Sequence, residues 1–143
     1  MSIQSAEIIC VGTELLMGHT LNTNSCFLAK ELVSLGIASY RQIVVGDNHE
    51  RLAEQIRESA SRADLVILTG GLGPTTDDIT MGVAAEVAGK ELVFDEESFQ
   101  NMSDYFRRLC RNMPKNNRKQ AMLPEGATIL KNNNGTAPGA ILE

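Results

Sequence analysis

The sequence predicts an α/β domain in which helices cover both faces of a mostly parallel sheet, a three-layer α/β/α arrangement. Short apolar runs alternate with stretches of helical periodicity over about the first 90 residues, the pattern of parallel strands joined by crossover helices. Polar or glycine-rich loops follow these runs, where the carboxyl ends of parallel strands would form a ligand crevice. A length of 143 residues suits one domain, residues 1–143.

The first strand and the first helix are predicted from an apolar run and a helical stripe. Residues 7–11 form a buried strand stopped by Gly12, and a polar loop follows over residues 12–23. Apolar residues then recur at helical spacing until Gly36, which ends the helix as a C′ glycine. These apolar positions are Phe27, Leu28, Leu32 and Leu35.

The second crossover is predicted between two further strands. Residues 40–45 alternate and are β-branched towards their end, which indicates a strand. Asp47 is predicted to begin the next helix, and Glu50, three residues later, completes a capping-box-like pair. Residues 64–68 form the third strand, and a glycine-rich loop over residues 69–78 follows it.

The second half of the chain shows weaker patterns. A helix over residues 79–87 is expected to follow the glycine-rich loop, and residues 92–94 indicate a short strand. Apolar residues from 99 to 110 predict a further helix that ends before a proline. Two last strands are expected at residues 127–130 and 140–142.

Composition excludes several classes of protein. A net charge of −5 and an aromatic content of 4% argue against a nucleic-acid partner, which usually requires a basic face and stacking side chains. No apolar run is long enough to span a membrane, and the first residues do not resemble a signal peptide. Three cysteines without CxxC spacing predict neither a disulfide framework nor a zinc site, so a cytoplasmic location is expected.

The loop over residues 69–78 is the strongest local indication of a binding site. Gly70, Gly71 and Gly73 let the backbone approach a ligand closely, and the following helix directs its free N–H groups towards the same place. This arrangement predicts an anion site. The alternative is an ordinary strand-to-helix turn, in which Thr76 or Asp77 caps the helix.

Carboxylates near the predicted crevice indicate a divalent cation. Asp77 and Asp78 would repel a phosphate unless a metal ion such as Mg²⁺ lay between them, and Asp47 and Glu14 could supply further oxygen ligands. The alternatives are that Asp47 is a plain helix cap and that Glu14 is a solvated loop acid. Lys119 belongs to a basic run that could close over a phosphate or could form a solvated face.

Several motifs together resemble the CinA (competence/damage-inducible) family, and the resemblance runs nearly end to end. The glycine-rich stretch is the most specific of them, while MoaB/MogA-type domains carry a Gly-Gly-Thr-Gly version. The motifs that carry the resemblance lie at residues 12–18, 22–24, 45–47, 70–80, 117–121, 123–127 and 134–139.

The resemblance implies a molybdopterin-binding-like fold with a pterin or nucleotide phosphate pocket at residues 70–78. In CinA-like relatives this domain is associated with metal-dependent hydrolysis of ADP-ribose and similar pyrophosphates, and in the MogA-like branch with molybdopterin adenylylation. Asp47 and Asp78 match the functional acids of the MogA-like branch. The family usually continues into an amidase domain that is absent here, and its N-terminal domain usually extends past Glu143.

Three functions therefore remain open. The first is binding of a nucleotide pyrophosphate with metal-dependent hydrolysis, the second is molybdopterin binding or adenylylation, and the third is non-catalytic nucleotide binding. A homo-oligomer is expected mainly from the resemblance. The predicted catalytic residues are Asp47 and Asp78, and the predicted metal ligands are Glu14, Asp47, Asp77 and Asp78. The predicted phosphate- or substrate-binding residues are Gly12, Thr13, Asn24, Gly70, Gly71, Gly73, Thr75, Thr76, Lys119, Asn134, Gly135 and Thr136.

Overall fold

A computed structural model describes residues 2–143, and the chain divides into two compact units. The first unit ends at Gly71 and the second runs from Leu72 to Glu143. Among residues 2–143, no helix is both long enough and apolar enough to cross a membrane.

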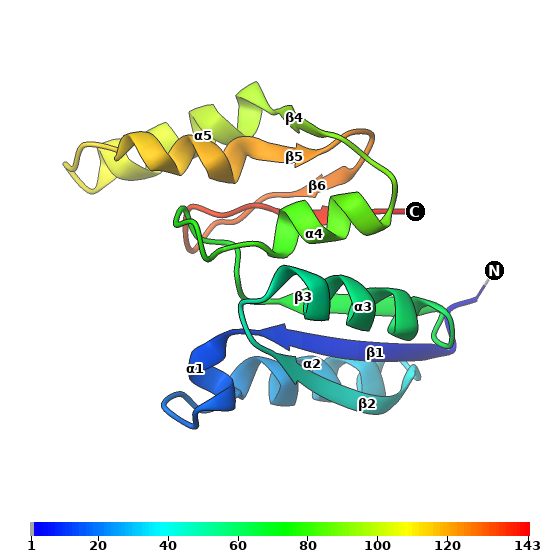
Figure 1. Cartoon of the computed structure of the whole chain (residues 1–143). Helices are drawn as coiled ribbons and strands as arrows, with labels where there is room; N and C mark the ends of the chain where they lie inside the picture. Colours follow the sequence, from blue (N-terminus) through cyan, green and yellow to red (C-terminus); the bar gives the residue numbers. More distant parts are fainter. Residues whose placement is uncertain (1) are drawn as a thin grey trace. The chain divides into compact units, whose positions relative to one another are not determined.

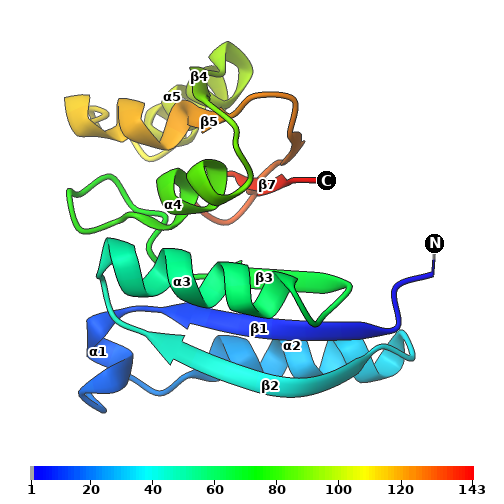
Figure 2. The ribbon, with the colours of Figure 1, turned by 45° about the vertical axis from the view of Figure 1, so that its right-hand side comes forward.

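The first unit is built on a parallel three-stranded sheet with the strand order β2–β1–β3 (Figure 1). Helices α2 and α3 lie on opposite faces of this sheet (Figures 1 and 2). The elements of the unit are β1 (Ser5–Val11), α1 (Thr13–Leu16), α2 (Thr23–Ser34), β2 (Ala38–Val45), α3 (His49–Ala60) and β3 (Leu65–Thr69).

The central strand β1 is buried on both faces, and this burial produces the layers. Ile8 and Cys10 point to one face, where they pack with Leu32 of α2 in one core cluster. Glu7 points to the other face, where its carboxylate accepts a 2.7 Å hydrogen bond from the hydroxyl of Ser59 in α3. The predicted three-layer arrangement around a parallel sheet is therefore confirmed.

Three local predictions in this unit were wrong. Asp47 does not cap the following helix, because Asn48 is the N-cap residue and its side chain accepts from the backbone N–H of Arg51. Residues 13–16 of the expected loop form the short helix α1. Phe27 and Leu35 are 63% and 72% exposed, because the side of α2 that packs on the sheet is centred on Leu28 and Leu32 instead.

The second unit contains two small antiparallel sheets, in which β4 pairs with β5 and β6 pairs with β7. Val83, Met102 and Leu123 are among its fully buried side chains. Its elements are α4 (Thr80–Val87), β4 (Leu92–Phe94), α5 (Glu96–Arg108), the 3₁₀ helix η1 (Lys115–Ala121), β5 (Met122–Pro124), β6 (Thr128–Leu130) and β7 (Gly139–Ile141).

The sequence missed β5, which pairs with β4 through a short run ending in Pro124. It also placed the start of α5 too late, since Asp95 caps the helix by accepting a 2.7 Å hydrogen bond from the N–H of Ser98. Neither Thr76 nor Asp77 caps α4. Ile79 occupies the N-cap position of that helix and makes no side-chain capping bond.

Candidate functional site

The carboxyl edge of the first unit gathers three loops that are distant in sequence. β1, β2 and β3 run parallel in register, so the segments that follow Val11, Val45 and Thr69 leave the sheet at the same edge. Two of these segments are joined directly, because the N–H of Gly12 donates to the carbonyl oxygen of Val45 over 2.9 Å. Ligand crevices of open parallel sheets lie at this edge.

Asp47 anchors the loop that follows β1. Its carboxylate accepts a hydrogen bond from the backbone N–H of Thr13, and its own N–H donates to the Thr13 hydroxyl, both over 3.1 Å. The Asp47 carboxylate thereby satisfies the N–H of Thr13, one of the first-turn donors of α1 that have no partner within the helix. The predicted site residues Thr13 and Asp47 are therefore in contact.

A pocket of about 160 Å³ lies at the same edge of the first unit. Glu14, Asn24 and Gly70, all predicted site residues, line it together. The amide of Asn24 donates to the Thr69 hydroxyl over 3.0 Å, which connects α2 to the end of β3. The remaining lining residues are Cys10, Val11, Leu15, Thr20, Leu21, Asn22, Thr23 and Thr69.

Only glycine fits at position 70. Its φ is +89°, a left-handed conformation that side chains rarely adopt, and a Cβ there would collide with the carbonyl oxygen of Val11. The neighbouring Gly71 also has a positive φ, of +62°. The loop after β3 can therefore lie against β1 only because these positions carry no side chain.

In the second unit, the loop donors converge on a carboxylate. The Asp78 carboxylate accepts from the N–H of Thr75 over 2.9 Å and from the Thr75 hydroxyl over 2.6 Å. It also accepts from the N–H of Gly73. A Cβ at Gly73 would lie 2.6 Å from an oxygen of Asp78, so this glycine is needed for the close approach. The donors of the loop thus bind an oxyanion, which is the carboxylate of Asp78 in the same loop.

Asp78 is ionised at neutral pH. Partial burial acts to raise the pKa of its carboxyl group, but the hydrogen bonds from Thr75 and Gly73 and the charge of Lys119 together hold it below the ordinary value. The exposed neighbour Asp77 makes no hydrogen bond or ion pair with any described residue. The two adjacent acids therefore have different surroundings.

Two polar side chains of η1 bind the backbone of the loop over residues 72–78. The Lys119 ammonium donates to the carbonyl oxygens of Thr75 and Asp78, the latter over 2.6 Å. The amide of Gln120 donates to the carbonyl of Leu72 over 3.0 Å. Lys119 was predicted as a direct phosphate ligand. In the structure its ammonium binds the loop backbone.

Two further residues of η1 make specific contacts, one within η1 and one with β4. The buried Asn117 donates to the Gln120 side chain over 2.8 Å, and the Arg118 guanidinium lies 3.9 Å from the centre of the Phe94 ring. Sequence reasoning missed Asn117 and Gln120. The available signal was three amide side chains, Asn116, Asn117 and Gln120, within six residues that also hold three basic ones, a composition that a purely solvated face does not need.

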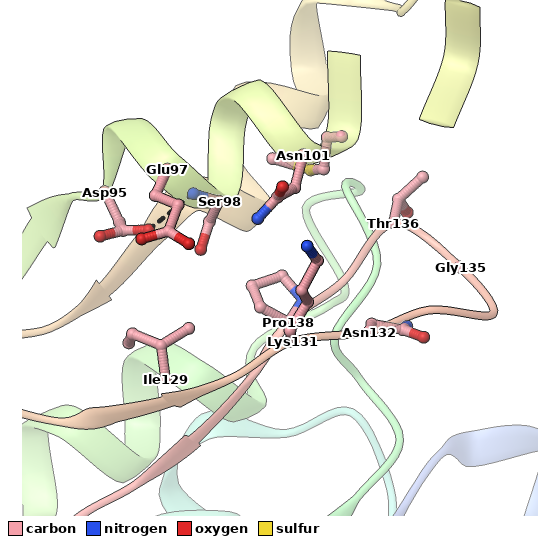
Figure 3. Close-up of a pocket in the computed structure, with 11 residues that line it drawn as sticks. Asp95, Glu97, Ser98, Asn101, Ile129, Lys131, Asn132, Gly135, Thr136 and Pro138 are labelled. Carbon is pink, nitrogen blue, oxygen red and sulfur yellow. Dashed lines mark hydrogen bonds between the residues drawn. The ribbon is translucent and has the colours of Figure 1, made fainter. Parts of the chain in front are cut away.

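A second pocket, of about 130 Å³, lies between α5 and the loop joining β6 to β7 (Figure 3). Gly135 and Thr136, both predicted phosphate contacts, line it. Asn134 does not line it, and its N–H donates instead to the Asn132 side chain over 2.9 Å. Thr76, another predicted contact, is exposed.

The predicted metal ligands fall in both units, with Glu14 and Asp47 in the first and Asp77 and Asp78 in the second. Within residues 2–143, no three histidine, cysteine or acidic side chains are grouped so that they could hold a metal ion. The side chains alone therefore do not form a complete metal site. Magnesium commonly takes one or two carboxylates and completes its shell with phosphate oxygens and water.

A family profile described as "Probable molybdopterin binding domain" matches residues 7–143. CinA from Thermoplasma acidophilum, a crystal structure of a protein with unknown function, is 32% identical with a TM-score of 0.86. That match covers 96% of this chain and 80% of the other. The chain belongs to the CinA family of molybdopterin-binding domains.

Among other CinA-type relatives are competence-damage inducible proteins of clostridia. The protein from Clostridium beijerinckii is 56% identical over 138 residues, and the one from Clostridioides difficile is 55% identical over 138 residues. These matches cover 96% of this chain but only 34% and 33% of the relatives. The chain thus spans about one third of the length of these proteins.

More distant solved structures share the fold alone. MoaB from Thermus thermophilus, described as a molybdopterin biosynthesis enzyme, has a TM-score of 0.59 at 18% identity, covering 95% of this chain and 79% of the other. A MogA structure has a TM-score of 0.58 at 21% identity, covering 94% of this chain and 78% of the other. These neighbours support the predicted molybdopterin-binding-type fold.

Proposed function

We propose that this domain binds a small pterin- or nucleotide-type ligand through a phosphate or pyrophosphate group. The observation that carries the proposal is the convergence of Gly73 N–H, Thr75 N–H and the Thr75 hydroxyl on one carboxylate. Donors that hold a carboxylate in this way also suit a phosphate oxygen, because both groups are anionic acceptors. The family description and the molybdopterin biosynthesis enzymes among the structural neighbours favour a pterin ligand.

In this proposal the ligand and Asp78 share the donors of the loop. A phosphate that enters must replace part of the Asp78 carboxylate's contacts, while Lys119 and Gln120 keep the loop backbone in place. Removing the charge of Asp78 should then strengthen phosphate binding.

The test is calorimetric titration of the protein with inorganic pyrophosphate and with ADP-ribose, in the presence of EDTA. We expect Asp78→Asn to bind about tenfold more tightly than the unmodified chain, since one charge-assisted competitor is lost. Asp77→Asn is the matched control, because it removes the same charge from a side chain that does not contact the loop amides. Equal tightening in both variants, or no binding in any of the three proteins, would contradict the proposal.

A second proposed function is metal-dependent hydrolysis of a nucleotide pyrophosphate such as ADP-ribose. The favouring observation is the pair of adjacent acids, one of which, Asp77, has no partner among the described residues. A Mg²⁺-like ion would be held by Asp77 or Asp78 together with oxygens of the ligand phosphate. When bound, such an ion supplies charge stabilisation to the reacting phosphate.

Release of AMP from ADP-ribose, measured with a panel of divalent metals and with EDTA, tests the hydrolysis. Turnover in Asp78→Asn should fall by about a hundredfold or more, because electrostatic stabilisation of phosphate charge is a large catalytic contribution. Near-normal turnover in a folded Asp78→Asn protein would refute the catalytic role. Absence of turnover in the unmodified protein would refute hydrolysis, while calorimetry would still decide on binding.

We further propose that the domain forms a homo-oligomer, as expected from the family resemblance. Several large apolar side chains of the first unit are exposed, including Met17, Leu21 and Phe27 at 62%, 85% and 63%. Large apolar side chains exposed at the surface can take part in association between copies. Light scattering over a range of concentrations measures the state, and a monomer at the highest concentration would contradict this proposal.

A further inference from the structure

The pocket between α5 and the β6–β7 loop carries polar groups that the fold itself does not use. Glu97, Asn101 and Lys131 line it, and none of their side chains makes a hydrogen bond or ion pair with any described residue. Ser98 also lines it, is only 5% exposed, and its hydroxyl likewise has no hydrogen-bond partner in residues 2–143. Among residues 2–143 only the Ser39 hydroxyl is fully buried without a partner, so the Ser98 hydroxyl is accessible from the pocket.

The charges of this pocket lie on two opposing walls. Figure 3 shows the carboxylates of Asp95 and Glu97 together on the side formed by the start of α5, with Lys131 on the strand side. Lys131 and Glu97 face the same hollow without forming an ion pair. Asp95 is already used as the helix cap, which fixes its carboxylate in position.

Three apolar side chains complete the lining of the pocket. Met102 of α5 is 2% exposed, Pro138 is buried, and Ile129 belongs to β6. The volume of about 130 Å³ accommodates a small organic molecule, since a single water needs only about 10–15 Å³. A small molecule that carries an ammonium and a carboxylate group beside a short apolar body fits this lining.

We propose that this pocket binds a small zwitterion of the α-amino acid class. The ligand's ammonium group faces the carboxylates of Asp95 and Glu97, and its carboxylate is held by the Lys131 ammonium and by the donors of Asn101 and Ser98. Its carbon skeleton contacts the apolar side chains of Met102, Ile129 and Pro138.

The same residues disfavour other ligand classes. A phosphate group would meet two carboxylates and only one ammonium, which gives the charged lining a net negative sign. A metal ion would be repelled by the positive charge of Lys131, which lines the same pocket. None of residues 72–78 lines the pocket, so it is distinct from the loop donors proposed above to hold a phosphate, although Gly135 and Thr136, which the sequence predicted as phosphate contacts, line it.

The experiment titrates the intact chain with a panel of small apolar α-amino acids, followed by NMR shifts of the Ser98, Asn101 and Thr136 amides. The matched probes are the amine and the carboxylic acid of the same carbon skeleton, each carrying one of the two charges. We expect saturable shifts with the zwitterions at millimolar concentrations and weaker binding of both singly charged probes. Equal binding of an acid and its amino acid, or no saturable shift with any zwitterion, would overturn the proposal.

Charge-removing variants test whether zwitterion binding depends on the pocket residues or on the overall charge of the protein. Glu97→Gln and Lys131→Met should each weaken binding by about tenfold or more, because each removes a charged hydrogen-bonding partner. Glu96→Gln and Lys90→Met are the controls, since both are exposed and neither lines the pocket. Weakening by the controls to the same extent as by the site variants would refute the assignment.

Ser98→Ala gives a readout that a structural role cannot mimic. The hydroxyl has no hydrogen bond to lose in the free protein, and alanine favours the helix more than serine does. The melting temperature should therefore stay the same or rise, while zwitterion binding weakens. A lower melting temperature with unchanged binding would show that the hydroxyl serves the fold and would contradict its part in the site.

Discussion

Glu7 offers the sharpest test of how the first unit is stabilised. Its side chain is only 3% exposed on the central strand, and it accepts hydrogen bonds from Arg62 over 2.5 and 3.0 Å, from Ser59 over 2.7 Å and from Arg41 over 3.4 Å. The Arg62 hydrogen bonds, against the opposing effect of burial and with help from Ser59, lower the pKa of Glu7 from 4.5 to about 2. The carboxylate is thus strongly favoured in the folded state.

The magnitude follows from proton linkage. A pKa lowered from 4.5 to about 2 corresponds to about 3 kcal/mol, at about 1.4 kcal/mol for each tenfold change. Because the folded pKa is the lower one, this stabilisation is fully present above about pH 4.5 and is lost as the pH falls towards 2. Glu7→Gln should therefore lower the free energy of unfolding by about 3 kcal/mol at pH 7 and by much less at pH 2.

The assay is urea unfolding of the unmodified chain and of Glu7→Gln at several pH values. Glu58→Gln is the matched control, since Glu58 pairs with the same Arg62 over 3.3 Å but its side chain is 59% exposed. Loss of the Glu58–Arg62 ion pair should lower the free energy of unfolding by less than about 1 kcal/mol at any pH, as for other exposed ion pairs. A Glu7→Gln effect that is equally large at pH 7 and pH 2, or no larger than that of Glu58→Gln, would refute the reasoning.

Three further predictions concern the loops of the candidate site. Gly70→Ala should lower the free energy of unfolding by about 2 kcal/mol or more, measured by urea unfolding, because of its positive φ and the collision with the Val11 carbonyl. Lys119→Met should raise the pKa of Asp78 towards its ordinary value, as followed by NMR titration, since a nearby positive charge is lost. Asp47→Ala should cost about 1 kcal/mol in thermal unfolding, while Asp47→Asn should cost less because it keeps an acceptor for the loop.

The pattern of apolar residues was sufficient to predict the main strands of the first unit. The apolar run at residues 7–11 and the alternation at residues 40–45 predicted strands that the structure contains, and Gly36 ends α2 with a φ of +74° as expected. These features depend on near neighbours in the chain. A strand that is buried on both faces must be apolar along most of its length, so it can be recognised without knowledge of its partners.

The partners of the polar side chains were less predictable. Asp47 had a reasonable local role as a helix cap, but it accepts instead from Thr13, 34 residues earlier. A cap contributes only about 1 kcal/mol, and Asn48 next to it performs that role equally well. The choice between two such similar alternatives depends on where the loop after β1 lies.

The sequence by itself determined the parallel α/β arrangement of the first unit, the strand ends where a site should form, and the glycines that a close backbone approach requires. Only the tertiary structure decided that Asp78 fills the donors of its own loop, that Lys119 binds the loop backbone, and that Glu97 and Lys131 face one pocket. The physical reason is how far apart the interacting residues lie along the chain. Periodicity records burial of neighbouring residues, whereas a hydrogen bond across 41 residues, as from Lys119 to Asp78, depends on the packing of every element between them.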